Sequence, residues 1–292
     1  MNELLRITGL SKSFGRRSVF RDLNLAMNAG RVYGFLGKNG EGKTTLVRIL
    51  MGIIPADSGE IHYKEAPVSF RSAGYKEEFG YIPEDPFFFG GMKVGEFLDF
   101  NAAFYRRWDG GRVDELLGRF SLDKKARIRT LSRGMKLKLE MATALAANPS
   151  VLILDDPTSG LDVPTRHDFL QGIVRELADS GTMILFATHL VHELERIVDH
   201  LFILEGGRII LDEEYEAVKN STRRVRLDLE DQLPEGFGID GILTESREGR
   251  RVEMVIYPWS EDKKQKIESL APRNLEIEPL SLEDIFRSFV AR

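Results

Sequence analysis

The stretch Gly37-Lys-Asn-Gly-Glu-Gly-Lys-Thr-Thr45 constrains this chain more than any other part of its sequence. It fits the pattern G-x-x-x-x-G-K-[ST] and lies between a strand predicted at 31–36 and a helix predicted after the loop. Glycines in such a loop let backbone N–H groups turn toward a phosphate, and the helix adds its positive N-terminal end. Lys43 supplies a cation for the β- and γ-phosphates, and the Thr44 hydroxyl is suited to bind Mg²⁺. The stretch therefore predicts a nucleoside triphosphate site built from Gly37, Lys38, Asn39, Gly40, Glu41, Gly42, Lys43, Thr44 and Thr45.

Apolar segments of strand length alternate with helical segments through the first three quarters of the chain. Buried strands are predicted at 151–154 and 183–188, with a long helix at 164–179 between them. This alternation predicts an α/β fold with a parallel sheet covered on both faces. The region from about 86 to 147 has helical character, with an amphipathic run from Val94 to Trp108, and predicts a helical subdomain.

The pattern changes near residue 218, which divides the chain into a domain at 1–217 and a small α+β domain at 218–292. The strands and helices predicted in this second domain are 221–230, 241–247, 251–258, 261–270 and 282–290.

Composition excludes several other functions. The chain has no cysteine, which rules out disulfides, thiolate zinc sites and cysteine nucleophiles. Its 41 Lys and Arg against 46 Asp and Glu give a net charge of −5, so it has no general basic field to attract nucleic acid. No apolar stretch approaches the roughly 20 residues that span a bilayer. If the protein works at a membrane, we expect another chain to hold it there.

Further motifs follow the phosphate-binding loop in a fixed order. They are Leu131-Ser-Arg-Gly-Met135, the strand and turn Leu154-Asp-Asp-Pro-Thr-Ser-Gly-Leu-Asp162, and Ala187-Thr-His189. A buried strand ending in Asp155 brings a carboxylate toward bound Mg²⁺. Together with the loop, these motifs resemble those of ABC ATPases over residues 3–217. The resemblance implies a P-loop NTPase core of the ABC type, with ATP and Mg²⁺ as cofactors.

The resemblance also assigns roles to single residues. Phe14 matches the aromatic residue that stacks on adenine, although an aromatic residue at a strand end is also often part of the core. Glu84 stands where the family usually has a glutamine that contacts Mg²⁺ and the attacking water, and His189 matches the histidine that contacts the γ-phosphate. His192, one helical turn later, is expected at the surface.

The signature segment and the turn after the second acid imply a composite site. Ser132 and Gly134 match the signature loop that binds the γ-phosphate held by a partner subunit, and Asp162 matches the turn that reaches that partner. The resemblance therefore implies two such domains, paired head to tail as a homodimer or heterodimer, with ATP between them.

The acid that polarises the attacking water is usually a glutamate, and here it is Asp156. The side chain is one methylene shorter, which places its carboxylate on the order of 1.5 Å further from the water, and a misplacement of that size can cost roughly 10²-fold in rate. We expect hydrolysis that is slow but real. Alternatively, Glu84 acts as a second acid and compensates.

The signature form Leu-Ser-x-Gly-Met resembles ATPases of bacterial ABC-2-type exporters, as does Pro279-Leu-Ser-Leu-Glu-Asp-Ile-Phe286 near the C-terminus. This implies an integral membrane permease as partner and a place at the cytoplasmic face of the cell membrane. The apolar run Pro86-Phe-Phe-Phe-Gly-Gly-Met92 is a candidate docking patch, unless its phenylalanines belong to the core. A soluble ABC ATPase with a regulatory, nucleic-acid-linked or ribosome-linked role is the alternative function. We expect the second domain to assist pairing or regulation.

Overall fold

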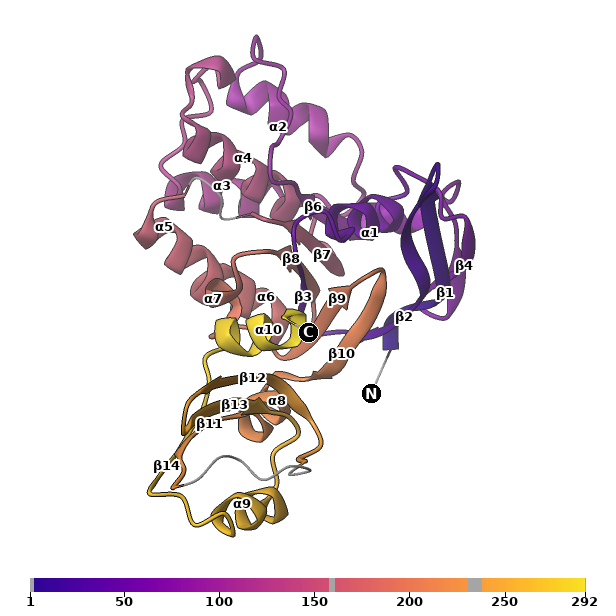
Figure 1. Cartoon of the computed structure of the whole chain (residues 1–292). Coiled ribbons are helices and arrows are strands. Elements are labelled where there is room, and N and C mark those ends of the chain that lie inside the picture. Colours follow the sequence, from indigo (N-terminus) through magenta and orange to yellow (C-terminus); the bar gives the residue numbers. More distant parts are fainter. Residues whose placement is uncertain (1–2, 158–160, 231–237, 292) are drawn as a thin grey trace.

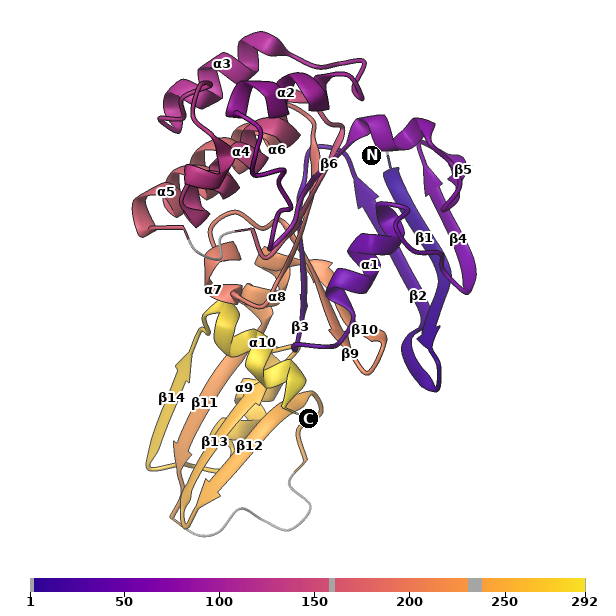
Figure 2. The same cartoon turned by 90° about the horizontal axis from the view of Figure 1, so that it is seen from above.

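The computed structural model describes residues 3–157, 161–230 and 238–291 (Figures 1 and 2). Its centre is a six-stranded sheet in the order β10-β9-β3-β8-β7-β6, with β10 antiparallel to β9 and the other neighbouring pairs parallel. The strands are β3 (Val32–Gly37), β6 (Phe79–Ile82), β7 (Val151–Asp155), β8 (Met183–Thr188), β9 (His200–Glu205) and β10 (Arg208–Glu214). Every residue of β3, β7 and β8 is buried, as expected for parallel strands covered on both faces.

The order of the strands places the functional segments side by side. The phosphate-binding loop follows β3, His189 follows β8, Asp155 ends β7 and Glu84 follows β6. These four strands are neighbours in the sheet. Their carboxyl ends therefore meet at one edge, where ligands bind in open α/β sheets.

An antiparallel sheet covers one side of this core, in the order β2-β1-β4-β5. Its strands are β1 (Glu3–Phe14), β2 (Arg17–Asn28), β4 (Ser58–Tyr63) and β5 (Ala66–Val68). Helix α1 (Lys43–Leu50) contacts β3, β7 and β8, and its apolar residues share one core with this sheet. The hairpin between β1 and β2 brings Phe14 and Arg17 to the nucleotide edge.

Helices lie on the opposite side of the central sheet (Figures 1 and 2). They are α2 (Val94–Ala102), α3 (Gly110–Arg119), α4 (Arg133–Ala146), α5 (Val163–His167) and α6 (Arg175–Asp179), with a π-helical segment, Asp168–Val174, joining the last two. The expectation of a helix extending to Trp108 is wrong, because α2 ends at Ala102. Asp109 caps α3 by accepting a hydrogen bond from the Arg112 N–H at 2.9 Å, so the chain has to turn before it.

The last part of the chain forms a third sheet, in the order β12-β13-β11-β14. Its strands are β11 (Arg223–Asp228), β12 (Ile242–Glu248), β13 (Arg251–Ile256) and β14 (Asn274–Glu278). One face packs on α9 (Glu261–Glu268) through a small core of its own that includes Ile267. Helix α8 (Tyr215–Ser221) leads into this sheet and runs across the position where the sequence changes character.

Two short helices connect this sheet to the central core. Helix α10 (Leu282–Val290) packs on α7 (Val191–Leu194), which follows His189. No helix within the described residues is both long and apolar enough to cross a membrane.

Candidate functional site

The backbone of the phosphate-binding loop requires glycine at two positions. Gly40 and Gly42 have φ angles of 83° and 119°, a region that other residues rarely adopt. A Cβ atom on Gly42 would lie only 2.5 Å from Cγ1 of Val19. Gly42 also precedes α1, so the N-terminal end of this helix opens into the loop.

Lys43 is buried inside the loop. Its Nζ donates hydrogen bonds to the carbonyl oxygens of Gly37 at 2.7 Å and Lys38 at 3.3 Å. Burial lowers the pKa of Lys43, while Asp156, Asp155 and other nearby carboxylates act in the opposite direction. The ammonium is thus already held beneath the loop, where a phosphate would meet it.

Two loop side chains point to other parts of the protein. Oε2 of Glu41 accepts a hydrogen bond at 2.9 Å from the N–H of Gly206, in the turn between β9 and β10. The sequence does not reveal this partner, because Gly206 lies 165 residues further along the chain. The Nζ of Lys38 donates to the carbonyl oxygen of Val290 at 2.5 Å, at the end of α10.

Thr44 and Asp155 provide oxygen atoms suited to a magnesium ion. Oγ1 of Thr44 lies 3.3 Å from Oδ1 of Asp155, and burial raises the pKa of Asp155 to about 6. Mg²⁺ binds oxygen ligands and usually combines one or two protein groups with water and substrate phosphates. The described residues contain no cluster of three or more His, Cys, Asp or Glu that would enclose a metal by itself. The pair therefore fits Mg²⁺ that arrives with a nucleotide.

Asp156 is buried and bonded to the segment that carries His189. Its Oδ1 accepts hydrogen bonds from the Thr188 hydroxyl at 2.6 Å and the His189 backbone N–H at 3.1 Å, and it lies 3.0 Å from Nδ1 of His189. Its φ of 45° is unusual for a residue other than glycine. The short carboxylate is thus drawn toward the end of β8. Sequence analysis missed Thr188, although it lies within the motif Ala187-Thr-His189.

These elements surround one open pocket of about 480 Å³. It is lined by Phe14, Arg17, Val19, Asn39, Gly40, Gly42, Lys43, Thr44, Thr45, Glu84, Asp156 and His189. Phe14 is 51% exposed, so the alternative that it is a core residue is wrong. Glu84 is exposed and lies near enough to Lys43 and Asp155 to influence the pKa of each.

Sequence analysis also missed Arg17 in this pocket. Its Nη2 donates to the carbonyl oxygen of Gly40 at 2.6 Å. The only signal in the sequence was its position at the end of the hairpin that carries Phe14.

Ser132, Gly134 and Asp162 are not among the residues that line this pocket. The Ser132 hydroxyl caps α4 by accepting a hydrogen bond from the Met135 N–H at 3.2 Å, and the side chain is exposed. Asp162 caps α5 in the same way, accepting from the Thr165 N–H at 2.9 Å, and this bond contributes to lowering the pKa of Asp162. Residues 158–160, between the second acid and Asp162, lie outside the described residues.

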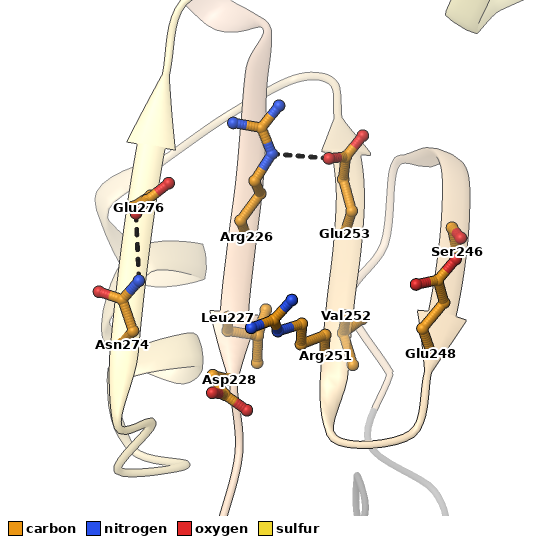
Figure 3. A pocket seen from close by; sticks show the side chains of 10 residues that line it. All are labelled: Arg226, Leu227, Asp228, Ser246, Glu248, Arg251, Val252, Glu253, Asn274 and Glu276. Atoms are coloured by element: carbon orange, nitrogen blue, oxygen red, sulfur yellow. Dashed lines mark hydrogen bonds and ion pairs between the residues drawn. The ribbon is translucent and has the colours of Figure 1, made fainter.

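A second pocket of similar volume lies on the C-terminal sheet, on the face away from α9 (Figure 3). Its lining is charged, with Arg226 and Arg251 among several carboxylates. Arg226 is already bonded to Glu253 at 2.7 Å and to Glu278 at 3.1 Å. None of the residues that line this pocket is a glycine, so it has no glycine loop for a phosphate, and the nucleotide edge is the better candidate site.

Comparisons with known proteins agree with this choice. Residues 20–159 match the family model described as "ABC transporter". The chain is 28% identical to the ABC transporter ATP-binding protein YtrB of Bacillus subtilis (strain 168), over 97% of each chain. It is 32% identical to the bacitracin transport ATP-binding protein BcrA of Bacillus licheniformis, over 80% of this chain and 77% of that one.

A solved structure gives the same result for the fold. The structure described as "Structure of ATP binding subunit of ABC transporter" superposes with a TM-score of 0.68 at 26% identity, and the match covers 74% of this chain and 92% of that chain. The α/β core expected from the sequence is thus confirmed as that of an ABC-type ATPase. This chain belongs to the family of ABC transporter ATP-binding proteins.

Proposed function

We propose that this chain is the ATP-hydrolysing subunit of a bacterial ABC-2-type exporter and works as one of a pair of such subunits. The observation that carries the proposal is the division of the site. One pocket unites the phosphate-binding loop with Glu84, Asp156 and His189, while the exposed signature loop lies outside it. Similarity to a bacitracin transport ATP-binding protein supports the assignment to a transporter.

In the proposed mechanism, ATP lies with its adenine on Phe14 and its phosphates in the glycine loop. Lys43 neutralises charge on the β- and γ-phosphates, and backbone N–H groups of the loop hold the phosphate oxygens. Thr44 and Asp155 would hold Mg²⁺, which would supply neutralisation of charge on the phosphates. Water would attack the γ-phosphate in line with the leaving group. Glu84 is one of the residues that line the pocket, where its carboxylate can face that water.

Asp156 and His189 act together in this mechanism. The contact of 3.0 Å between Oδ1 and Nδ1 orients the imidazole, so its other nitrogen is available to the γ-phosphate. Because Oδ1 is also engaged by Thr188, only the second oxygen of Asp156 is available to polarise water. This arrangement supports slow hydrolysis.

The composite site explains why the signature loop is exposed. The N-terminal end of α4, with Ser132 as its cap, offers a hydroxyl and N–H groups to a phosphate held by a second subunit. That subunit is a copy of this chain or a related chain. ATP between the two then stabilises the pair, and hydrolysis releases it.

Sedimentation of the Asp156→Asn protein tests this proposal. With Mg-ATP, and hydrolysis blocked, we expect a dimer. With Mg-ADP, or after the additional substitution Ser132→Arg, we expect a monomer. Identical sedimentation in all three conditions would contradict ATP-driven pairing.

A row of exposed aromatic side chains supports a membrane permease as the partner. The aromatic ladder consists of Phe87, Phe89, Phe100 and Phe104, which are 81%, 52%, 45% and 62% exposed. Successive ring centroids lie 5.6, 6.3 and 5.2 Å apart, so the rings form one continuous surface. Exposed apolar patches of this kind mark interaction sites. Through this contact the permease would hold the chain at the cytoplasmic face of the membrane.

A further inference from the structure

The ammonium group of Lys38 connects the phosphate-binding loop to the C-terminal helix. Its Nζ donates to the carbonyl oxygen of Val290 at 2.5 Å and lies 3.6 Å from Oε1 of Glu205. Carbonyl groups at the C-terminal end of a helix carry partial negative charge and have no partner within the helix. The contact therefore stabilises the end of α10 against the loop that binds phosphate.

The same helix packs on the segment that follows His189. Ile285 and Phe289 of α10 share one apolar core with Val191 and Leu194 of α7. Helix α7 begins two residues after His189. Figures 1 and 2 both show α10 beside α7, between the central sheet and the C-terminal sheet. One short helix thus contacts both the phosphate-binding loop and the end of the histidine segment.

Helix α10 is also attached to the C-terminal sheet. Nη2 of Arg224 on β11 lies 3.4 Å from Oδ2 of Asp284, and the rings of Tyr257 and Phe289 pack edge to face at 5.2 Å. Val255 of β13 belongs to the same apolar core. A displacement of the C-terminal sheet would therefore be transmitted to α10.

We propose that α10 is a positioning element for the nucleotide site, and that Lys38 is the residue through which it acts on the phosphate-binding loop. When α10 is docked, it fixes the position of this loop relative to the segment that carries His189. Binding of nucleotide and docking of α10 then favour each other, because coupling between two binding equilibria is reciprocal. Through α10, the C-terminal sheet affects the nucleotide affinity of the site without contributing a residue to it. This goes beyond the proposed function and does not depend on the export partner.

Two substitutions in the full chain weaken α10 docking to different extents. Phe289→Ala removes an aromatic ring from the core. Asp284→Asn removes only the ion pair with Arg224, and this milder variant tests the proposal if Phe289→Ala fails to fold. Arg287→Ala is the matched control, because Arg287 lies on the same helix but pairs with Glu283 on its exposed side. Fluorescence titration with a labelled ADP and Mg²⁺ measures nucleotide affinity.

We expect Phe289→Ala to raise the Kd about fivefold, Asp284→Asn about twofold, and Arg287→Ala not at all. Lys38→Met should raise the Kd by itself but add nothing in the Phe289→Ala background, because both act through one contact. Conversely, Mg-ADP should slow hydrogen exchange of the α10 amides in the unsubstituted chain about fivefold, the same factor as the effect of Phe289→Ala on the Kd. Fully additive effects on the Kd, or α10 exchange that does not respond to nucleotide, would overturn the proposal.

Discussion

At the scale of single residues, Oδ1 of Asp156 already receives hydrogen bonds from Thr188 and His189. A glutamate at this position has one more methylene and can reach further into the pocket while the backbone stays in place. We therefore expect Asp156→Glu to raise kcat for ATP hydrolysis about tenfold or more, since the attack of water is sensitive to the placement of the carboxylate within an ångström. Steady-state ATPase assays of the partner-coupled protein provide the measurement. An unchanged kcat would show that the aspartate does not limit hydrolysis.

The environment of Glu140 makes the stability of the protein depend on pH. It lies on α4, where burial raises its pKa to about 7, and it is close enough to Tyr81 on β6 and to Tyr105 to raise the pKa of each. A carboxyl whose pKa is higher in the folded than in the unfolded chain binds its proton more firmly when folded. Stability therefore falls as pH rises from about 4.5 to about 7.

Glu140→Gln removes this dependence. We expect the variant to be more stable than the unsubstituted chain by about 3 kcal/mol at pH 8 and by less than about 1 kcal/mol at pH 5. Urea unfolding at the two pH values measures the difference. Asp99→Asn, a substitution of an exposed acid on α2, is the control and should show no such change. An equal increase in the free energy of unfolding at both pH values would contradict a carboxyl at Glu140 whose pKa is raised in the folded chain.

The sequence predicted local conformation where a backbone requirement selects the residue. Gly40 and Gly42 have the positive φ that favours glycine, and Nζ of Lys43 lies within the same loop, where it donates to the carbonyl oxygen of Gly37. The roles of these residues in nucleotide binding stay predictions. Arg17 and the bond from Glu41 to Gly206 could not be predicted, because each depends on a contact between segments distant in the chain.

At the scale of elements, neighbouring phenylalanines of the run 86–92 have different environments. The residues of the aromatic ladder are exposed, and Phe88 packs on the core. Phe88 lies between two ladder residues in sequence, but its ring packs on Phe97 at 5.1 Å and against the main core. The structure thus divides the run 86–92. The core interpretation is confirmed for Phe88, while Phe87 and Phe89 are exposed and stay candidates for docking.

We expect Phe87→Ser with Phe89→Ser to reduce co-purification with the membrane permease at least tenfold while nucleotide affinity stays unchanged. Phe88→Ser should instead lower the Tm by several degrees, because it removes a ring from the core. Phe70→Ser, a substitution of a 43% exposed phenylalanine outside the ladder, is the matched control. Undiminished co-purification of the double variant would exclude the ladder as the docking surface.

Element prediction from the sequence succeeded where burial leaves a pattern. Strands β7 and β8 are short apolar runs buried on both faces, and the sequence identified both. The hairpin of β9 and β10 was missed, because β10 is mostly exposed at the sheet edge and its sequence, Arg208–Glu214, is rich in charged residues. Its pairing with β9 is set by the tertiary fold rather than by its own composition.

At the scale of the whole molecule, the proposed mechanism requires a nucleotide site that one chain cannot complete. The phosphate-binding loop and the signature loop are both formed in this chain, yet the pocket contains only the first. Two copies arranged head to tail would bring each signature loop to the other's pocket.

Mixing two inactive variants tests this claim most directly. Lys43→Ala removes the phosphate-binding lysine, and Ser132→Arg blocks the signature loop, so each protein alone should have almost no ATPase activity. A dimer that contains one of each variant has one intact site out of two. In an equal mixture we therefore predict ATPase activity far above that of either variant alone, and at least about a quarter of that of the unsubstituted protein, the share that random pairing gives. Activity of the mixture no higher than the average of the two separate variants would contradict the composite site.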